Sequence, residues 1–230
     1  PNTTDIPGRR YCYGKQPEIA FWNLYQLANA LRQLDIDEKS LIECLDEYKN
    51  RYINSWQKTF VTKLGFKQYS GNKHDVLINS LIDIFKKFGL DWTIFFRQLS
   101  SINFGNNKTS KKHNLELVAS SSYQIRNASF ENEVDQWLSN YIYQIKTEEI
   151  KSEERIKLMN ATNPIYVPRN FILQQAIEKA QKDDFTLIHE LMKVMQNPYT
   201  DQGLSYKQFN IKRPNWADNK PGCSSLSCSS

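Results

Sequence analysis

The feature that most restricts the fold of this chain is a repeat of apolar residues at three- and four-residue spacing. The repeat begins after Pro17, a residue suited to the first turn of a helix, and continues to Leu34. It resumes after Asp37, which can cap a second and longer helix, and stops at Gly65. The apolar stripe of this second helix is Leu41, Leu45, Tyr48, Tyr52, Trp56, Phe60 and Leu64. Such spacing predicts amphipathic helices.

The same repeat predicts further helices toward the C-terminus. Their expected segments are 77–88, 92–99, 134–145, 147–159, 168–180 and 185–195. Asp91 can cap the second of these, and Asp183 or Asp184 can cap the last, which Pro198 ends. No alternation of strands with helices and no repeat of fixed period appears, so the predicted class is mainly α.

Three stretches are expected along the chain. Residues 1–16 read as irregular coil, residues 17–198 as a helical region, and residues 199–230 as a coil tail. Glycine, asparagine and serine interrupt the helical pattern near 100–130, which predicts a long surface loop with a short apolar piece at 115–119.

Composition excludes several classes of protein. Only 8 Gly and 8 Pro stand against 12 Tyr, 12 Phe and 5 Trp, which argues against collagen and overall disorder. The apolar stretches fall short of the roughly 20 residues that span a bilayer, so no membrane segment is expected. The net charge is +5, but its signs are interspersed and no nucleic-acid-reading motif is present, so no nucleic-acid partner is expected.

Familiar motifs for catalysis are absent from these residues. The sequence has no GxGxxG, no GxxxxGK[ST] and no GxSxG, and its three histidines lie outside any HExxH pattern. We therefore predict no catalytic, cofactor-binding or metal-binding residue within this segment.

The four cysteines fall into two groups. Cys44 lies on the long predicted helix, where a buried or half-buried apolar role is expected. Cys12, Cys223 and Cys228 lie in predicted coil near the two ends, and the last two have neither CxxC nor zinc-knuckle spacing. The thiol of Cys228, third from the end of the sequence, is expected to be accessible, which favours reactivity.

Several segments in order resemble the selenoprotein O (SelO) family. Residues 7–14 (PGRRYCYG), followed by Gln16-Pro17 and residues 21–24 (FWNL), resemble the GRY…QP…WNL segment of that family. Residues 163–170 (NPIYVPRN) are similar to its NPxYxxRN stretch. Residues 214–217 (PNWA) and 227–230 (SCSS) continue the resemblance, which is weakest from about 100 to 130.

This resemblance implies a protein-kinase-like fold and transfer of AMP from ATP to hydroxyl side chains of other proteins. The family's glycine-rich loop, ATP lysine, catalytic Asp and metal-binding residues precede the GRY segment. We therefore expect the C-terminal half of such an enzyme: residues 1–16 in the activation segment and a helical C-lobe without the strand-rich N-lobe. ATP and Mg²⁺ would belong to the full-length parent, and this segment alone would be inactive.

The resemblance also implies partners and a compartment. The expected partners are protein substrates bearing hydroxyl side chains and the parent's own N-terminal lobe. The location would be mitochondrial in a eukaryote and cytoplasmic in a bacterium. Without the N-lobe, part of the helical surface would lose its packing partner, so an exposed apolar patch is expected.

The family often carries selenocysteine or cysteine third from the end, where this chain has Cys228. Its selenocysteine form tends to have a cysteine three residues upstream, where this chain has Ser225. We expect a disulfide between Cys12 and Cys228, with Cys223 as the alternative partner. Closing a loop on the order of 200 residues would stabilise by at most roughly 5 kcal/mol in the chain-entropy treatment. Two free thiols in a reducing compartment are the competing expectation.

Two other interpretations stay open at the level of sequence. One is a free-standing helical interaction module with a redox-sensitive C-terminal cysteine. The other is a catalytically inactive member of the family, because the deciding residues lie outside this sequence.

Overall fold

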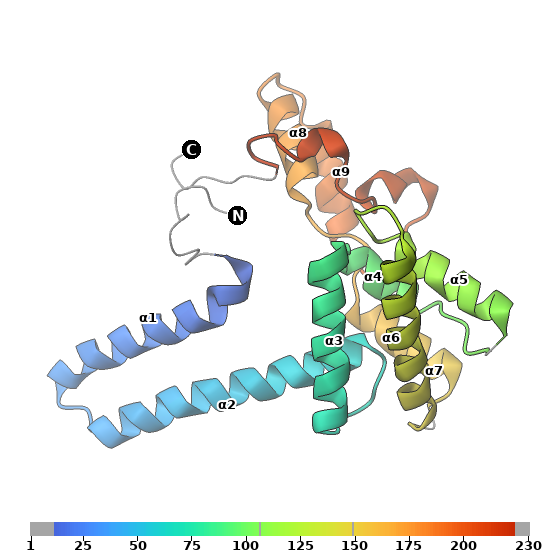
Figure 1. The fold of residues 1–230 in the computed structure, drawn as a ribbon. Helices are drawn as coiled ribbons and strands as arrows, with labels where there is room; N and C mark the ends of the chain where they lie inside the picture. The colour runs from blue at the N-terminus through green and yellow to red at the C-terminus, as the bar shows by residue number, and fades with distance from the viewer. Residues whose placement is uncertain (1–11, 106, 149, 224–230) are drawn as a thin grey trace. The chain divides into compact units, whose positions relative to one another are not determined.

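The computed structural model describes residues 12–105, 107–148 and 150–223, which form a helical fold (Figure 1). The α-helices are α1 (Gln16–Leu31), α2 (Glu38–Lys63), α3 (Asn72–Phe88), α4 (Trp92–Leu99), α5 (Lys108–Ala119), α6 (Ala128–Lys146), α7 (Ser152–Thr162), α8 (Asn170–Ala180) and α9 (Thr186–Met195). Shorter 3-10 helices are η2 (Tyr13–Lys15), η3 (Arg32–Leu34), η4 (Leu204–Phe209) and η5 (Asn215–Ala217). The described residues contain no strand, so the predicted mainly α class is confirmed.

The chain divides into two compact units. The first holds the residues up to Gln57 and those from Pro214 onward, and the second holds residues 58–213. The boundary falls inside α2, so this helix contributes its first part to one unit and its last turns to the other. Within the described part, no helix combines the length and the apolar character needed to cross a membrane.

A helical hairpin of α1 and the first part of α2 forms the body of the first unit (Figure 1). Asp37 caps α2 as predicted, because its Oδ2 accepts hydrogen bonds from the backbone N and the hydroxyl of Ser40, both at 2.9 Å. The Tyr48 hydroxyl donates to the carbonyl oxygen of Pro17 at 3.0 Å. The rings of Phe21 and Tyr48 stack at 6.1 Å between centroids. These contacts join the start of α1 to the middle of α2.

The helices of the hairpin carry several exposed large apolar side chains. The largest exposed side chains on its helices include Trp22 (47% exposed), Tyr25 (49%), Leu27 (53%) and Ile53 (52%). Cys44 is also exposed, so the prediction of a buried or half-buried position for this thiol was wrong. The reason is geometric: a helix packed against one neighbour covers a single stripe, and apolar spacing alone does not tell which stripe that is.

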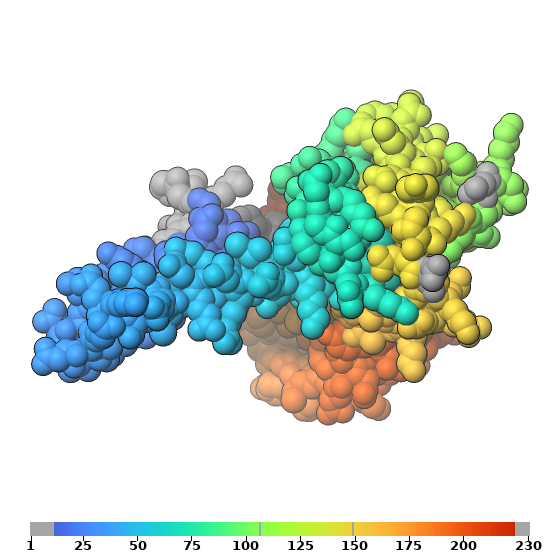
Figure 2. Space-filling view, turned by 90° about the horizontal axis from the view of Figure 1, so that it is seen from below, coloured from blue at the N-terminus to red at the C-terminus, as the bar shows by residue number. Residues whose placement is uncertain are grey.

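The core of the second unit lies between α3 and α6, which Figure 2 shows side by side. Trp137 on α6 donates its indole N–H to the carbonyl of Leu77 on α3 at 3.0 Å. The neighbouring Tyr141 is fully buried and donates its hydroxyl to the carbonyl of Leu64 at 2.6 Å. Burial raises the pKa of Tyr141 to about 12, so the hydroxyl keeps its proton and its role as a donor. Of the apolar residues that predict the helix over 77–88, Leu77, Leu81, Ile84 and Phe88 are buried in the core, and Phe85 is half-buried.

The prediction of a long surface loop near 100–130 was wrong over α5, a helix of 12 residues. The side chain of Asn107 caps α5 by accepting a hydrogen bond from the backbone N of Ser110 at 2.8 Å. The helix escaped the apolar-periodicity test because small polar residues occupy most of its inner face. Its buried positions are Ser110, Asn114 and Val118, four residues apart.

Hydrogen bonds replace apolar contacts on this inner face. The Asn114 amide accepts from the backbone N of Asn103 at 2.8 Å and donates to its carbonyl at 2.7 Å, much as a neighbouring strand would. The serines that follow were expected at the surface, but Ser121 and Ser122 are buried. Their hydroxyls donate to the carbonyls of Val118 and Phe88, at 2.7 and 3.1 Å. Satisfied polar groups can be buried without a large penalty.

The tail expected as coil contains the two short helices η4 and η5. Gly203 starts η4 from a left-handed backbone, with φ at 82°. Its backbone N donates to Oδ1 of Asp201 at 2.9 Å, which closes the preceding turn. Phe209, at the end of η4, is buried and fixes this short helix to the second unit.

Gly65, which ends α2, supplies the first prediction. Its φ is 87°, and a Cβ there would lie 2.8 Å from Cγ of Arg155 and 2.9 Å from Sδ of Met159, both in buried side chains. We expect Gly65→Ala to lower the free energy of unfolding by about 2–4 kcal/mol, from overpacking and backbone strain together. Urea denaturation of the purified protein measures this quantity.

Gly89→Ala is the matched control, because Gly89 also has a left-handed backbone (φ 57°) while a Cβ there would meet its nearest atoms at 3.9 Å. This variant should lose only the strain contribution, about 1 kcal/mol. Equal losses in the two variants would contradict the crowding of Gly65.

Candidate functional site

The cysteines predicted as redox residues lie partly outside the described chain. Cys12 precedes η2 and is half-buried, and Cys223 is buried; both belong to the first unit. Cys228 lies outside the described residues, so the pairing of Cys12 with Cys228 stays a prediction. Among the residues that the structure describes, no group of three or more His, Cys, Asp or Glu side chains is placed to hold a metal ion.

The segment 163–170, here called the anchored segment, is fixed in the second unit at both ends. At its start, the amide of Asn163 donates to the carbonyl of Lys63 at 2.9 Å, and the ammonium of Lys63 donates back to Oδ1 of Asn163 at 3.2 Å. Asn163 is buried, so this reciprocal pair replaces contacts with water. The C-terminal end of α2 thereby holds the segment in register.

The middle of the anchored segment is tied to the chain after α9. The backbone N–H groups of Ile165 and Tyr166 both donate to the carbonyl of Pro198, at 2.8 and 3.2 Å. The Tyr166 hydroxyl accepts from the backbone N of Gln202 at 3.2 Å. Because proline has no backbone N–H, Pro198 helps to end α9. Its carbonyl accepts both hydrogen bonds and thereby anchors this segment.

Arg97, on α4, links the anchored segment to the end of α7 and to the chain after α9. Its Nη1 donates to the backbone carbonyls of Asn160, Asn163 and Tyr199, at 3.2, 3.0 and 3.4 Å. Burial lowers the pKa of Arg97, and the charge of Asp201 acts against that shift. A charged guanidinium therefore satisfies carbonyls from three separate stretches of chain.

At the end of the anchored segment, Arg169 forms a buried ion pair with Asp91. The two guanidinium nitrogens Nη1 and Nη2 donate to the two carboxylate oxygens at 2.6 and 2.9 Å. The side chains are 12% and 5% exposed. Asp91 also caps α4, as predicted, by accepting from the backbone N of Ile94 at 3.0 Å, and it accepts from the hydroxyl of Tyr123 at 2.7 Å.

These contacts decide how Asp91 titrates. Burial by itself would raise the pKa of Asp91, but hydrogen bonds and charge from Arg169, with the donors of Ile94 and Tyr123, outweigh it, so the pKa lies below its ordinary value of 3.8. Burial raises the pKa of Tyr123, whose hydroxyl therefore remains a donor at neutral pH. The carboxylate is ionised and fully paired.

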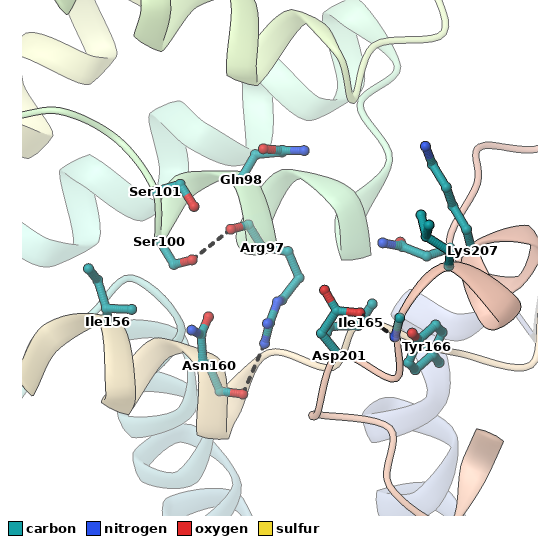
Figure 3. A pocket seen from close by; sticks show the side chains of 13 residues that line it. Arg97, Gln98, Ser100, Ser101, Ile156, Asn160, Ile165, Tyr166, Asp201 and Lys207 are labelled. Atoms are coloured by element: carbon teal, nitrogen blue, oxygen red, sulfur yellow. Dashed lines mark hydrogen bonds between the residues drawn. The ribbon is translucent and has the colours of Figure 1, made fainter. Parts of the chain in front are cut away.

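A pocket of about 610 Å³ opens beside the anchored segment (Figure 3). We call it the α4–α7 pocket, because one wall comes from the end of α4 and from α7, and the other from η4 and the turn before it. The side chains that line it include Arg97, Ser101, Ile156, Asn160, Tyr166, Asp201, Leu204, Lys207 and Asn210. Its volume falls within the roughly 300–1,000 Å³ typical of ligand pockets.

Sequence reasoning missed most of this arrangement. Asp91 was recognised as a helix cap, but Arg169 lies 78 residues away, and no local pattern connects the two. Nothing in the sequence selects Arg97, because its partners are backbone carbonyls, which every residue has. The segment 163–170 was singled out only through its resemblance to the SelO family.

Comparison with known proteins identifies the class. The chain is 39% identical over 233 residues to a protein of Flavobacterium johnsoniae and 36% identical over 233 residues to one of Tolumonas auensis, each named protein nucleotidyltransferase YdiU. Both alignments cover 100% of this chain and 44% and 43% of the relatives. The chain is therefore homologous to part of a protein nucleotidyltransferase, and it spans less than half the length of these relatives.

The family follows from a second comparison. Residues 1–196 match the model of the family described as protein adenylyltransferase SelO. The chain belongs to the SelO family.

The ion pair of Asp91 gives the second prediction. Asp91→Asn keeps a capping oxygen but leaves Arg169 buried without its counter-charge, so we expect a loss of about 3 kcal/mol at neutral pH, measured by urea denaturation. Because the pKa of Asp91 is lowered on folding, the stabilisation by its charge is complete above 3.8 and is lost as pH falls through the folded value. The difference in free energy of unfolding between wild type and Asp91→Asn should therefore become smaller as the pH falls below 3.8.

Asp83→Asn is the control, since Asp83 pairs with Lys86 at 3.5 Å while both side chains remain more than two-thirds exposed (76% and 73%). Surface pairs of this kind contribute little, so this variant should stay within about 0.5 kcal/mol of wild type. A comparable loss in both variants, or a gap that does not change with pH, would contradict the assignment.

Proposed function

We propose that the parent protein transfers AMP from ATP to hydroxyl side chains of proteins. The observation that carries this proposal is the match of residues 1–196 to the family described as protein adenylyltransferase SelO, together with identity to two proteins named protein nucleotidyltransferase over the whole chain. In this reaction a Ser, Thr or Tyr hydroxyl attacks the α-phosphorus of ATP. A new phosphoester bond forms, and pyrophosphate leaves.

The nucleotide and its metal do not fit the described residues. These residues contain no cluster of carboxylates for a divalent ion, and the sequence has no glycine-rich phosphate-binding turn. We assign ATP and Mg²⁺ to the part of the parent that this chain does not cover, in a protein-kinase-like arrangement. The present segment alone is proposed to be inactive and to supply the helical C-lobe.

The exposed apolar side chains of the hairpin support a packing role toward the rest of the parent. Trp22, Tyr25 and Leu27, all on α1, are each about half exposed, and large apolar side chains exposed together often mark an interaction surface. The relatives are more than twice as long as the segment they share with this chain. We propose that the N-terminal lobe of the parent covers this surface.

The third prediction concerns the reaction itself. The full-length parent, incubated with ATP and Mg²⁺, should add the mass of one AMP group to itself or to an acceptor protein, as measured by intact-protein mass spectrometry. Pyrophosphate should accumulate in equal amount, since α-phosphoryl transfer releases it. The 230-residue segment, assayed alone, is the control and should give neither product.

Release of ADP with addition of a phosphoryl group would indicate kinase chemistry instead. Absence of both products, under reducing and oxidising conditions and without ATP binding, would favour a helical interaction module.

The fourth prediction concerns the terminal thiols. Under oxidising conditions, non-reducing peptide mapping of the parent should recover Cys12 linked to Cys228, and Cys12→Ser should remove that linkage. Recovery of Cys12 linked to Cys223 would assign the alternative partner, and recovery of unlinked thiols would contradict a redox role for the tail. Cys44→Ser is the control, because Cys44 is exposed on α2 and takes no part in the expected linkage.

A further inference from the structure

Residues 64–71, here called the α2–α3 connection, are held in place by a histidine in the first turn of α3. Gly71 precedes this helix and has no side chain that could cap it. Instead, Nδ1 of His74 reaches back and accepts a hydrogen bond from the backbone N of Ser70 at 3.0 Å. The contact resembles half of a capping box, in which a side chain of the first turn pairs with a backbone N–H before the helix.

The imidazole of His74 is enclosed by the core. The residue is 1% exposed, and its ring lies 4.4 Å from the ring of Phe66, which is fully buried. Because Nδ1 accepts a hydrogen bond, the proton of the neutral ring is on Nε2. Nε2 is buried and has no hydrogen-bond partner among the described residues. One ring nitrogen therefore requires the neutral form, and the other has no acceptor with which to stabilise the charged form.

A proton added to this ring would meet three unfavourable interactions. It would make Nδ1 a donor that faces the N–H of Ser70, so their hydrogen bond would be lost. The new charge would be buried, and it would lie in the first turn of a helix, where the partial charge of the backbone is also positive. The geometry therefore favours neutral His74 while the connection keeps its place.

The charged side chains around the ring do not reverse this preference. Among the described residues, those that act on His74 are its neighbours Lys73 and Asp75 on α3, and Glu148, which follows α6. On the α2–α3 connection, the Tyr69 ring lies 6.1 Å away, and its hydroxyl donates to Asp75 at 2.7 Å. Burial and the charge of Lys73 lower the pKa of His74, and the two carboxylates oppose that shift without cancelling it.

We propose that the α2–α3 connection is an acid-sensitive switch, which neutral His74 holds closed and protonated His74 releases. In the released form, the ring leaves Phe66 and both of its N–H groups donate to water. The released form binds a proton at the ordinary histidine pKa of 6.5, and the closed form binds it less readily. The closed form is therefore fully favoured above that pH and becomes less favoured as the pH falls below it. The inference does not depend on AMP transfer.

The experiment measures backbone hydrogen exchange of the full-length protein by mass spectrometry at pH 7.5 and 5.0, with exchange times scaled to equal chemical exchange. Protection over 64–72 should fall at least fivefold at the lower pH, and up to about thirtyfold, the limit for a released form that titrates at 6.5. Residues 134–141, in the core part of α6, are the internal control and should change less than twofold. A smaller change over 64–72, or an equal loss in both peptides, would overturn the proposal.

His74→Asn tests the imidazole itself, because the amide oxygen of Asn can accept from Ser70 but gains no proton in this pH range. Its protection over 64–72 should be the same at both pH values. His113→Asn, at an exposed position of α5, is the matched control and should keep the wild-type response. An acid response that persists in His74→Asn would contradict the switch. Exchange of the imidazole C2–H in the wild-type protein gives the titration midpoint of His74 without any substitution, and a midpoint at or above 6.5 would also overturn the inference.

Discussion

The ion pair between Asp91 and Arg169 is the interaction on which the arrangement of the second unit depends. A carboxylate that is 5% exposed must recover from its neighbours the hydrogen bonds that it loses from water. Asp91 does so through Arg169, Tyr123 and the backbone of Ile94, which belong to three separate stretches of chain. Such a pair is not in itself strongly stabilising, but any arrangement that separates its partners leaves a buried charge unpaired. Its main effect is therefore to exclude alternative packings.

The ion pair of Asp91 and Arg169 also helps to fix the wall of the α4–α7 pocket that the anchored segment forms. Arg169 fixes one end of the anchored segment, and the reciprocal hydrogen bonds of Asn163 and Lys63 fix the other. Tyr166 lies between these two points, and its backbone and hydroxyl are bound to the turn that follows α9. A segment held at both ends and in the middle has little conformational freedom left to lose when a ligand binds. The lining contributed by Tyr166 and the turn is thus preorganised.

The features that the sequence predicts depend on local interactions, and the features that it does not predict depend on contacts between distant segments. The helices themselves, the caps Asp37 and Asp91, and the stop at Gly65 follow from local rules, and the structure bears them out. The apolar stripes are only partly buried, since Leu24 and Leu27 on α1 are exposed. α5 was missed because its inner face is paired through the amide of Asn114, which a test for apolar periodicity does not register. The exposure of Cys44 and the pocket itself depend on contacts between segments far apart in the chain. No local pattern encodes such contacts.

The short helix α4 shows how the charges of the second unit are compensated. It has eight residues, and its N-terminus holds the carboxylate of Asp91. Its C-terminus holds Arg155, whose Nη2 donates to the carbonyl of Ser100 at 2.9 Å and whose guanidinium lies 4.7 Å from the centre of the Phe104 ring. Each charge is opposite in sign to the partial charge at its end of the helix, so both interactions are favourable. Arg155 is 1% exposed and donates hydrogen bonds to backbone carbonyls and to the thioether of Met159. Backbone dipoles and an aromatic face therefore stabilise this cation, as Asp91 stabilises Arg169. Arg97, on the same helix, also donates to backbone carbonyls, but the charge of Asp201 acts on it as well, and it borders the α4–α7 pocket. Of the two arginines that donate to backbone carbonyls at this end of α4, Arg155 is enclosed by the core, whereas Arg97 lines a pocket.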